Sequence, residues 1–87
     1  MSLNLAAALA IAETISRQAP LAIREMLLSS RRSIEEGPLA AARALADALG
    51  TKVTLVDRAP VAGKEEQRLW RASRRFYEIA SRASQLP

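Results

Sequence analysis

The chain has 87 residues, enough for one domain at most, and a chain of this length buries only about 60% of its unfolded surface. It contains no cysteine and no histidine, which excludes disulfides, a zinc–thiolate site, a cysteine nucleophile and the commonest general base. Hydrophobic residues make up 49% of the chain but aromatic ones only 3%, and alanine buries little area. We therefore expect part of the apolar surface to face a partner, and we predict a homo-oligomer with no cofactor.

Pro20 separates two stretches in which apolar residues have helical spacing. Before it, apolar residues recur at steps of three and four, as on one face of a helix, at Leu5, Ala8, Leu9, Ala12 and Ile15. Asn4 is a suitable N-cap, so the first helix is predicted over about residues 4–18. Proline pushes the preceding residue out of the helical region and suits a first helical turn, so a second helix should begin at Pro20.

The second helix is predicted over about residues 20–36, with Gly37 as a left-handed stop. Two sets of apolar residues in it have helical spacing. One is Leu21, Leu28 and Ile34, and the other is Ile23, Leu27 and Ile34. The sequence alone leaves open which of the two faces packs against the first helix.

Residues around this corner resemble a known family. The stretches 11–15 (IAETI), 19–24 (APLAIR) and 34–37 (IEEG) are similar to the C-terminal helical region of the crotonase superfamily, which includes the enoyl-CoA hydratases and isomerases. The resemblance covers about residues 5–46. Leu27 departs from it, because the family often has lysine seven residues after the proline, and the tail at residues 51–87 lies outside it.

The resemblance implies a role without catalysis. Crotonase catalysis depends on an oxyanion hole of backbone N–H groups, and often on glutamates, all from a core that precedes the matched region. No catalytic residue of the family can therefore be assigned to any position here, and we expect no enzyme activity from this chain alone. The family's C-terminal helices pack outside the catalytic core and contribute to subunit association. The resemblance thus implies a non-catalytic helical fragment whose partner is another copy or the missing crotonase-like core.

Proline and glycine also mark the third helix. Pro38 opens it and Gly50 ends it, which predicts a helix over about residues 38–49. Residues 51–57 differ, because their β-branched side chains favour an extended chain. No other stretch reads as a strand, so this segment should pair with another copy, lie extended across the helices, or be helical despite its composition.

A short linker, residues 58–63, leads into the last helix, predicted over about residues 64–84. Its apolar stripe consists of Leu69, Ala72, Phe76, Ile79 and Ala83, and Trp70 and Tyr77 border the stripe. A basic row on the flank consists of Arg68, Arg71, Arg75 and Arg82, a candidate anion-binding or partner-binding face. The chain is thus expected to be a single all-α domain of three or four helices.

Two other groups of residues are weaker candidates for a catalytic site. Glu35 and Glu36 are neighbours on a predicted helix and point about 100° apart, so they do not share an acid–base site. Ser29, Ser30 and Ser33 lack a histidine to activate them and are interpreted as polar residues of a helix flank.

Arginines interleaved with aromatic residues can stack on bases and bind phosphates. The alternative function is therefore an independent small helical protein that binds another macromolecule, such as nucleic acid, through its basic last helix. A net charge of +4 is modest for a nucleic-acid-binding protein, so we prefer the interpretation that these arginines form a solvated or interface face. No apolar run approaches the ~20 residues of a membrane span, so we expect no membrane partner and a cytoplasmic location.

Overall fold

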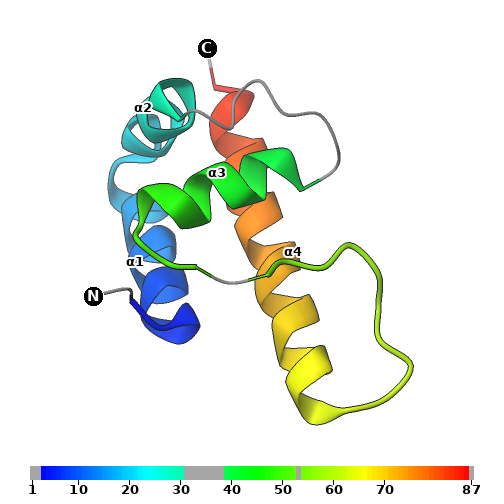
Figure 1. Ribbon diagram of the computed structural model, residues 1–87. Helices are drawn as coiled ribbons and strands as arrows, with labels where there is room; N and C mark the ends of the chain where they lie inside the picture. Colours follow the sequence, from blue (N-terminus) through cyan, green and yellow to red (C-terminus); the bar gives the residue numbers. More distant parts are fainter. Residues whose placement is uncertain (1–2, 31–38, 53, 87) are drawn as a thin grey trace.

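The computed structural model describes residues 3–30, 39–52 and 54–86. This part of the chain contains four α-helices, α1 (Leu5–Gln18), α2 (Pro20–Ser29), α3 (Ala40–Ala48) and α4 (Lys64–Ser84), and no strand. α4 is the longest element, and α1, α2 and α3 all pack against it (Figure 1). The predicted all-α class is confirmed.

The corner between α1 and α2 has the predicted local chemistry. The Asn4 side chain accepts a hydrogen bond from the Ala7 N–H at 2.7 Å and caps α1. Ala19 has non-helical dihedrals, φ −149° and ψ 67°, and Pro20 occupies the first turn of α2. The proline therefore ends one helix and starts the next, as the sequence indicates.

The second helix is shorter than predicted. It ends at Ser29, and Ser30 is extended at φ −75° and ψ 140°, so the helix predicted over residues 20–36 is interrupted at Ser30, and residues 31–36 lie outside the described ones. The Ser29 hydroxyl donates to the carbonyl oxygens of Glu25 at 3.0 Å and Met26 at 3.2 Å. These bonds do not by themselves end the helix, because Ser73 makes the same kind of bond to Leu69 in the middle of α4. The predicted stop at Gly37 lies outside the described residues.

The predicted glycine stop after α3 is confirmed. Gly50 has φ 81°, a left-handed conformation that suits glycine. Its N–H donates to the Asp47 carbonyl at 3.0 Å, and the Thr51 N–H donates to the Ala46 carbonyl at 3.1 Å. This pair of bonds is the Schellman pattern, which satisfies carbonyls left free at a helix end. At the other end α3 begins at Ala40, two residues later than predicted.

The core lies where the other helices meet α4. Phe76 and Ile79 of α4 are buried together with Ile23 of α2 and Leu45 of α3. Of the predicted apolar stripe of the last helix, Ala72, Phe76, Ile79 and Ala83 are buried, whereas Leu69 is half-buried. Alanine supplies more than half of the buried apolar residues among those described. On α1, both buried residues are alanines, Ala8 and Ala12. Small side chains let the helices approach closely but contribute little buried area each.

The segment at 51–57 lies across the helices, which is one of the three arrangements left open by the sequence. Leu55 is buried in the core, and the Val56 N–H donates to the Ser73 hydroxyl on α4 at 3.0 Å. That hydroxyl in turn donates to the Leu69 carbonyl at 2.7 Å. Thr51 is also buried, and its hydroxyl has no hydrogen-bond partner. Within the described residues the segment forms no helix and no strand.

Candidate partner-binding surface

The predicted basic row on α4 divides into parts with different surroundings. Arg68, Arg71 and Arg75 line an open groove between the start of α1 and the first half of α4, whereas Arg82 lies outside that groove near the end of the helix. Arg68, Arg71 and Arg82 are exposed, and Arg75 is half-buried. The structure therefore brings three of the four predicted residues together.

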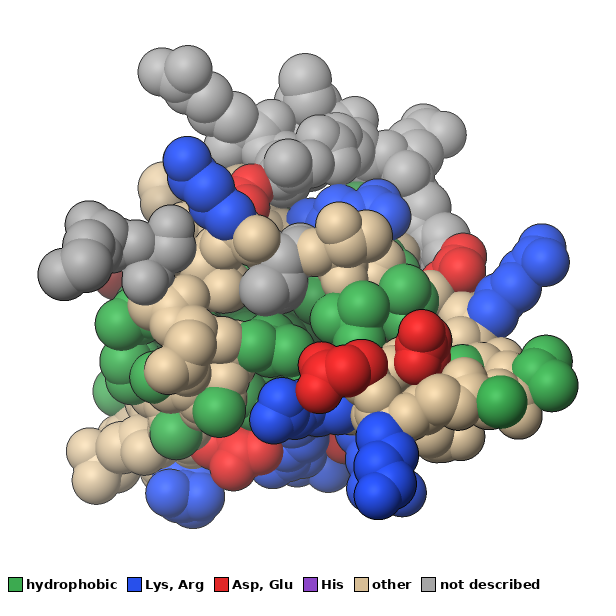
Figure 2. Space-filling view, turned by 60° about the horizontal axis from the view of Figure 1, so that its bottom comes forward, with side chains coloured by type: hydrophobic (Ala, Val, Ile, Leu, Met, Phe, Trp, Pro, Cys, Tyr) green, Lys and Arg blue, Asp and Glu red, His purple; other side chains and the backbone are tan. Residues whose placement is uncertain are grey.

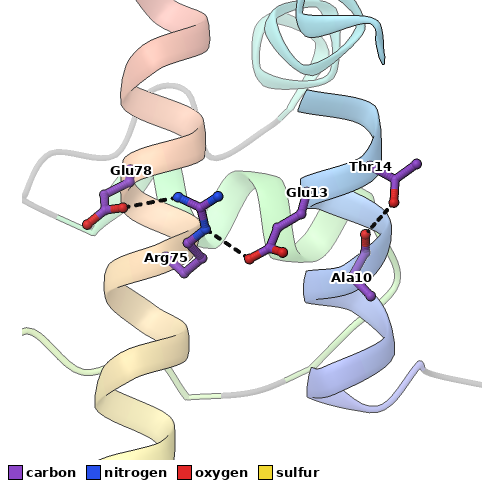
Figure 3. A network of polar contacts seen from close by, with 5 residues as sticks. All are labelled: Ala10, Glu13, Thr14, Arg75 and Glu78. Atoms are coloured by element: carbon purple, nitrogen blue, oxygen red, sulfur yellow. Dashed lines mark hydrogen bonds and ion pairs between the residues drawn. The ribbon is translucent and has the colours of Figure 1, made fainter. Parts of the chain in front are cut away.

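Arg75 is held by two carboxylates. Its Nε donates to Glu13 of α1 at 2.9 Å, and its Nη1 donates to Glu78 at 3.2 Å (Figure 3). The hydrogen bond to Glu13, supported by the one to Glu78, raises the pKa of Arg75 although burial opposes this change. The charge of Arg75 is therefore compensated within the chain, and its role is to connect α1 to α4.

The two acidic residues of the groove, Glu65 and Glu66, differ in their contacts. Glu65 forms an exposed pair with Arg68 at 3.5 Å, which contributes little to stability because both side chains are well solvated. The Glu66 carboxylate lies over Gly63, so close that a Cβ at Gly63 would overlap it. It thus sits at the N-terminus of α4, where a negative charge is favoured by the helix dipole. In the described part of the chain, Arg71 and Lys64 have no ion pair.

A second arrangement on α4 combines an aromatic residue with an arginine that the predicted row omits. The Arg74 guanidinium lies 5.5 Å from the centre of the Trp70 ring, within the range of a cation–π contact. Tyr77 is 39% exposed three residues further on. The spacing of four between Trp70 and Arg74 was the sequence signal for this pair, because residues i and i+4 are neighbours on a helix.

The groove itself has an apolar floor. From α1 it is lined by Leu5, Ala6 and Leu9, and from α4 by Leu69 and Ala72. Leu5 and Leu9 pack partly against the core, whereas Ala6 is exposed. Figure 2 turns this end of the molecule forward and shows apolar side chains with both basic and acidic side chains among them. On that face the charges do not form a patch of one sign.

A second apolar surface lies on α2. The structure decides between the two faces that the sequence left open, because Ile23 is fully buried and Leu27 is half-buried. Leu21 and Leu28 are left 56% and 72% exposed. They are seven residues apart, which is close to two helical turns, so they lie on the same side of α2. We call Leu21 and Leu28 the outer face of α2.

No catalytic arrangement can be assigned within the described residues. Glu35, Glu36 and Ser33 lie outside them, and the Ser29 hydroxyl is engaged with backbone carbonyls of its own helix. No cluster of three potential metal ligands occurs in the part of the chain that the structure describes. None of the helices described there combines the length and the apolar character that a membrane crossing requires.

No model of a protein family, no curated protein and no solved structure matches this chain. The crotonase resemblance therefore rests on the quoted residues around the corner at Pro20.

Proposed function

We propose that the chain is a non-catalytic helical module that associates with a second copy of itself through the outer face of α2. The observation that carries this proposal is the exposure of Leu21 and Leu28 on one side of a short helix. Burying a leucine side chain is worth about 1.5–3 kcal/mol, so two leucines from each copy provide a substantial driving force. A symmetric contact of one surface with itself is the commonest way to form a dimer.

The composition of the core supports the same proposal. Among the described residues, alanine makes up more than half of the buried apolar positions, and each buried alanine contributes little apolar area. The crotonase resemblance also fits, because the corresponding helices of that family contribute to subunit association outside the catalytic core. A missing crotonase-like core is the other partner that this resemblance implies. The lack of cysteine is compatible with a reducing compartment such as the cytoplasm.

One observation favours the alternative, nucleic-acid binding through α4. The Trp70–Arg74 pair and exposed Tyr77 could stack on unpaired bases. However, the positive charge of Arg75 is balanced by ion pairs with Glu13 and Glu78. Acidic side chains are also interspersed with the basic ones (Figure 2). The positive field along the helix is reduced accordingly, so association through α2 is the preferred function.

The experiment compares two charge substitutions at exposed apolar residues. Leu28→Asp places a charge on the outer face of α2, and Val61→Asp makes the same change in the linker, where Val61 is fully exposed. By size-exclusion chromatography with light scattering we expect a dimer for the unmodified chain and for Val61→Asp, and a monomer with unchanged helix content for Leu28→Asp. A Leu28→Asp variant that remains dimeric would refute the assignment of this face.

A further inference from the structure

The groove between α1 and α4 is a separate surface from the outer face of α2. α2 packs near the C-terminal end of α4 (Figure 1). The groove lies along the first half of α4. The Glu13–Arg75 pair joins α1 and α4 beside the groove (Figure 3). A ligand in the groove would therefore leave Leu21 and Leu28 free, and the two surfaces can be tested independently.

The shape of the groove favours a helix as its occupant. The groove is open along one side, so it would cover only one face of a ligand. Sites for small molecules usually enclose most of the surface of the ligand. An amphipathic helix needs only its apolar face covered. The α4 wall extends from Lys64 to Arg75, roughly 17 Å at 1.5 Å per residue, which matches about three turns of a bound helix.

The floor provides apolar contacts at helical spacing. Leu5 and Leu9 are one turn apart on α1, and Leu69 and Ala72 are three residues apart on α4. Side chains that follow these rows form ridges and grooves into which the ridges of a third helix can pack. The ligand is therefore expected to present apolar residues at positions i, i+3 or i+4, and i+7.

The charged residues on the rim of the groove determine which charges are expected beside the apolar face of the bound helix. Of the two acidic residues that line the groove, Glu65 pairs with Arg68, whereas Glu66 lies at the start of α4 and has no ion pair in the described part of the chain. Arg71 and Lys64 line the groove and have no ion pair among the described residues. Within the rim that the structure describes, two unpaired cations thus stand against one unpaired carboxylate, which leaves a net positive charge. Acidic side chains beside the apolar stripe of a ligand would pair with Lys64 and Arg71.

We propose that this groove binds an amphipathic helix of a partner protein with acidic residues flanking its apolar face. The partner differs from a second copy of this chain, whose expected contact is through α2. Lys64 and Arg71 orient the acidic flank, and Leu5, Leu9 and Leu69 receive the apolar residues.

The test uses a fluorescently labelled synthetic helix with leucines at the spacing given above and glutamates on both flanks, and a control peptide with lysine in place of each glutamate. Anisotropy titrations with the full chain should show saturable binding of the acidic peptide and weaker binding of the lysine peptide. The Leu28→Asp variant should bind the acidic peptide as the unmodified chain does, which separates this proposal from association through α2.

Two pairs of matched variants locate the site. Arg71→Glu should weaken binding by about fivefold or more, whereas Arg82→Glu, an equal charge change on the same helix outside the groove, should change it less than about twofold. Ala6→Glu should weaken binding more than Ala10→Glu, because both alanines are exposed on α1 but only Ala6 lines the groove.

Several results would overturn the proposal. They are absence of saturable binding, equal affinity for the two peptides, and equal effects of Arg71→Glu and Arg82→Glu. Two competitors distinguish other ligands. If laurate displaces the acidic peptide and the Arg71→Glu variant no longer shows this displacement, the groove is assigned to an anionic amphiphile. The same result with a random oligonucleotide assigns the groove to nucleic acid.

Discussion

Replacing Phe76 by alanine is expected to destabilise the fold more than any other single truncation in α4. Phe76 is fully buried and is the largest fully buried side chain among the described residues. It packs in one cluster with residues from every other helix and with Leu55. Phenylalanine-to-alanine changes at such sites cost about 3–5 kcal/mol, because apolar contact is lost and the cavity collapses only partly.

The neighbouring aromatic residue provides a matched control. Tyr77 is 39% exposed, and Tyr77→Ala is expected to cost less than about 1 kcal/mol. The assay is urea unfolding followed by circular dichroism. With a slope of about 1–3 kcal/mol per molar urea, Phe76→Ala should lower the midpoint by roughly 2 M, enough to unfold a marginal domain. A loss within about 1 kcal/mol for Phe76→Ala, or an equal loss for Tyr77→Ala, would refute the burial argument.

Three further outcomes are expected. Thr51→Val should raise the free energy of unfolding by about 1 kcal/mol in the same urea assay, since it removes a buried hydroxyl that has no partner; a loss of stability would contradict this. Glu13→Gln should lower it by up to about 1 kcal/mol, because the Arg75 side chain is still 36% exposed. The contribution of the Glu13–Arg75 ion pair to stability is present below the ordinary pKa of arginine and is lost only as the pH rises through the raised pKa of Arg75. Glu13→Gln should therefore have equal effects on stability at neutral and mildly alkaline pH. The purified chain should show no hydration of a short-chain enoyl-CoA, and steady turnover would contradict the non-catalytic proposal.

Local signals in the sequence were sufficient for most helix boundaries. Asn4 acts through its side chain, and Pro20 and Gly50 act through their own backbone, in each case on residues nearby in the sequence. The structure has a helix boundary at each of them. The end of α2 at Ser29 has no comparable signal in the sequence, because the apolar periodicity continues beyond it to Ile34. The periodicity was the wrong guide there, and the predicted second helix was too long.

The surfaces depended on contacts that sequence spacing does not contain. Glu13 and Arg75 are 62 residues apart, so the neutralisation of Arg75 could not be predicted from the basic row on α4. The two apolar faces of α2 had equally good spacing, and only packing against the other helices distinguishes Ile23 from Leu21. The groove requires α1 and α4 side by side, which no local pattern indicates.

Sedimentation equilibrium of the unmodified chain over a hundredfold range of concentration tests the proposed association most directly. Self-association through Leu21 and Leu28 predicts a dimer at the highest concentration that dissociates reversibly on dilution. The Leu28→Asp variant should remain monomeric over the same range. A single monomeric species of the unmodified chain at every concentration would contradict the account.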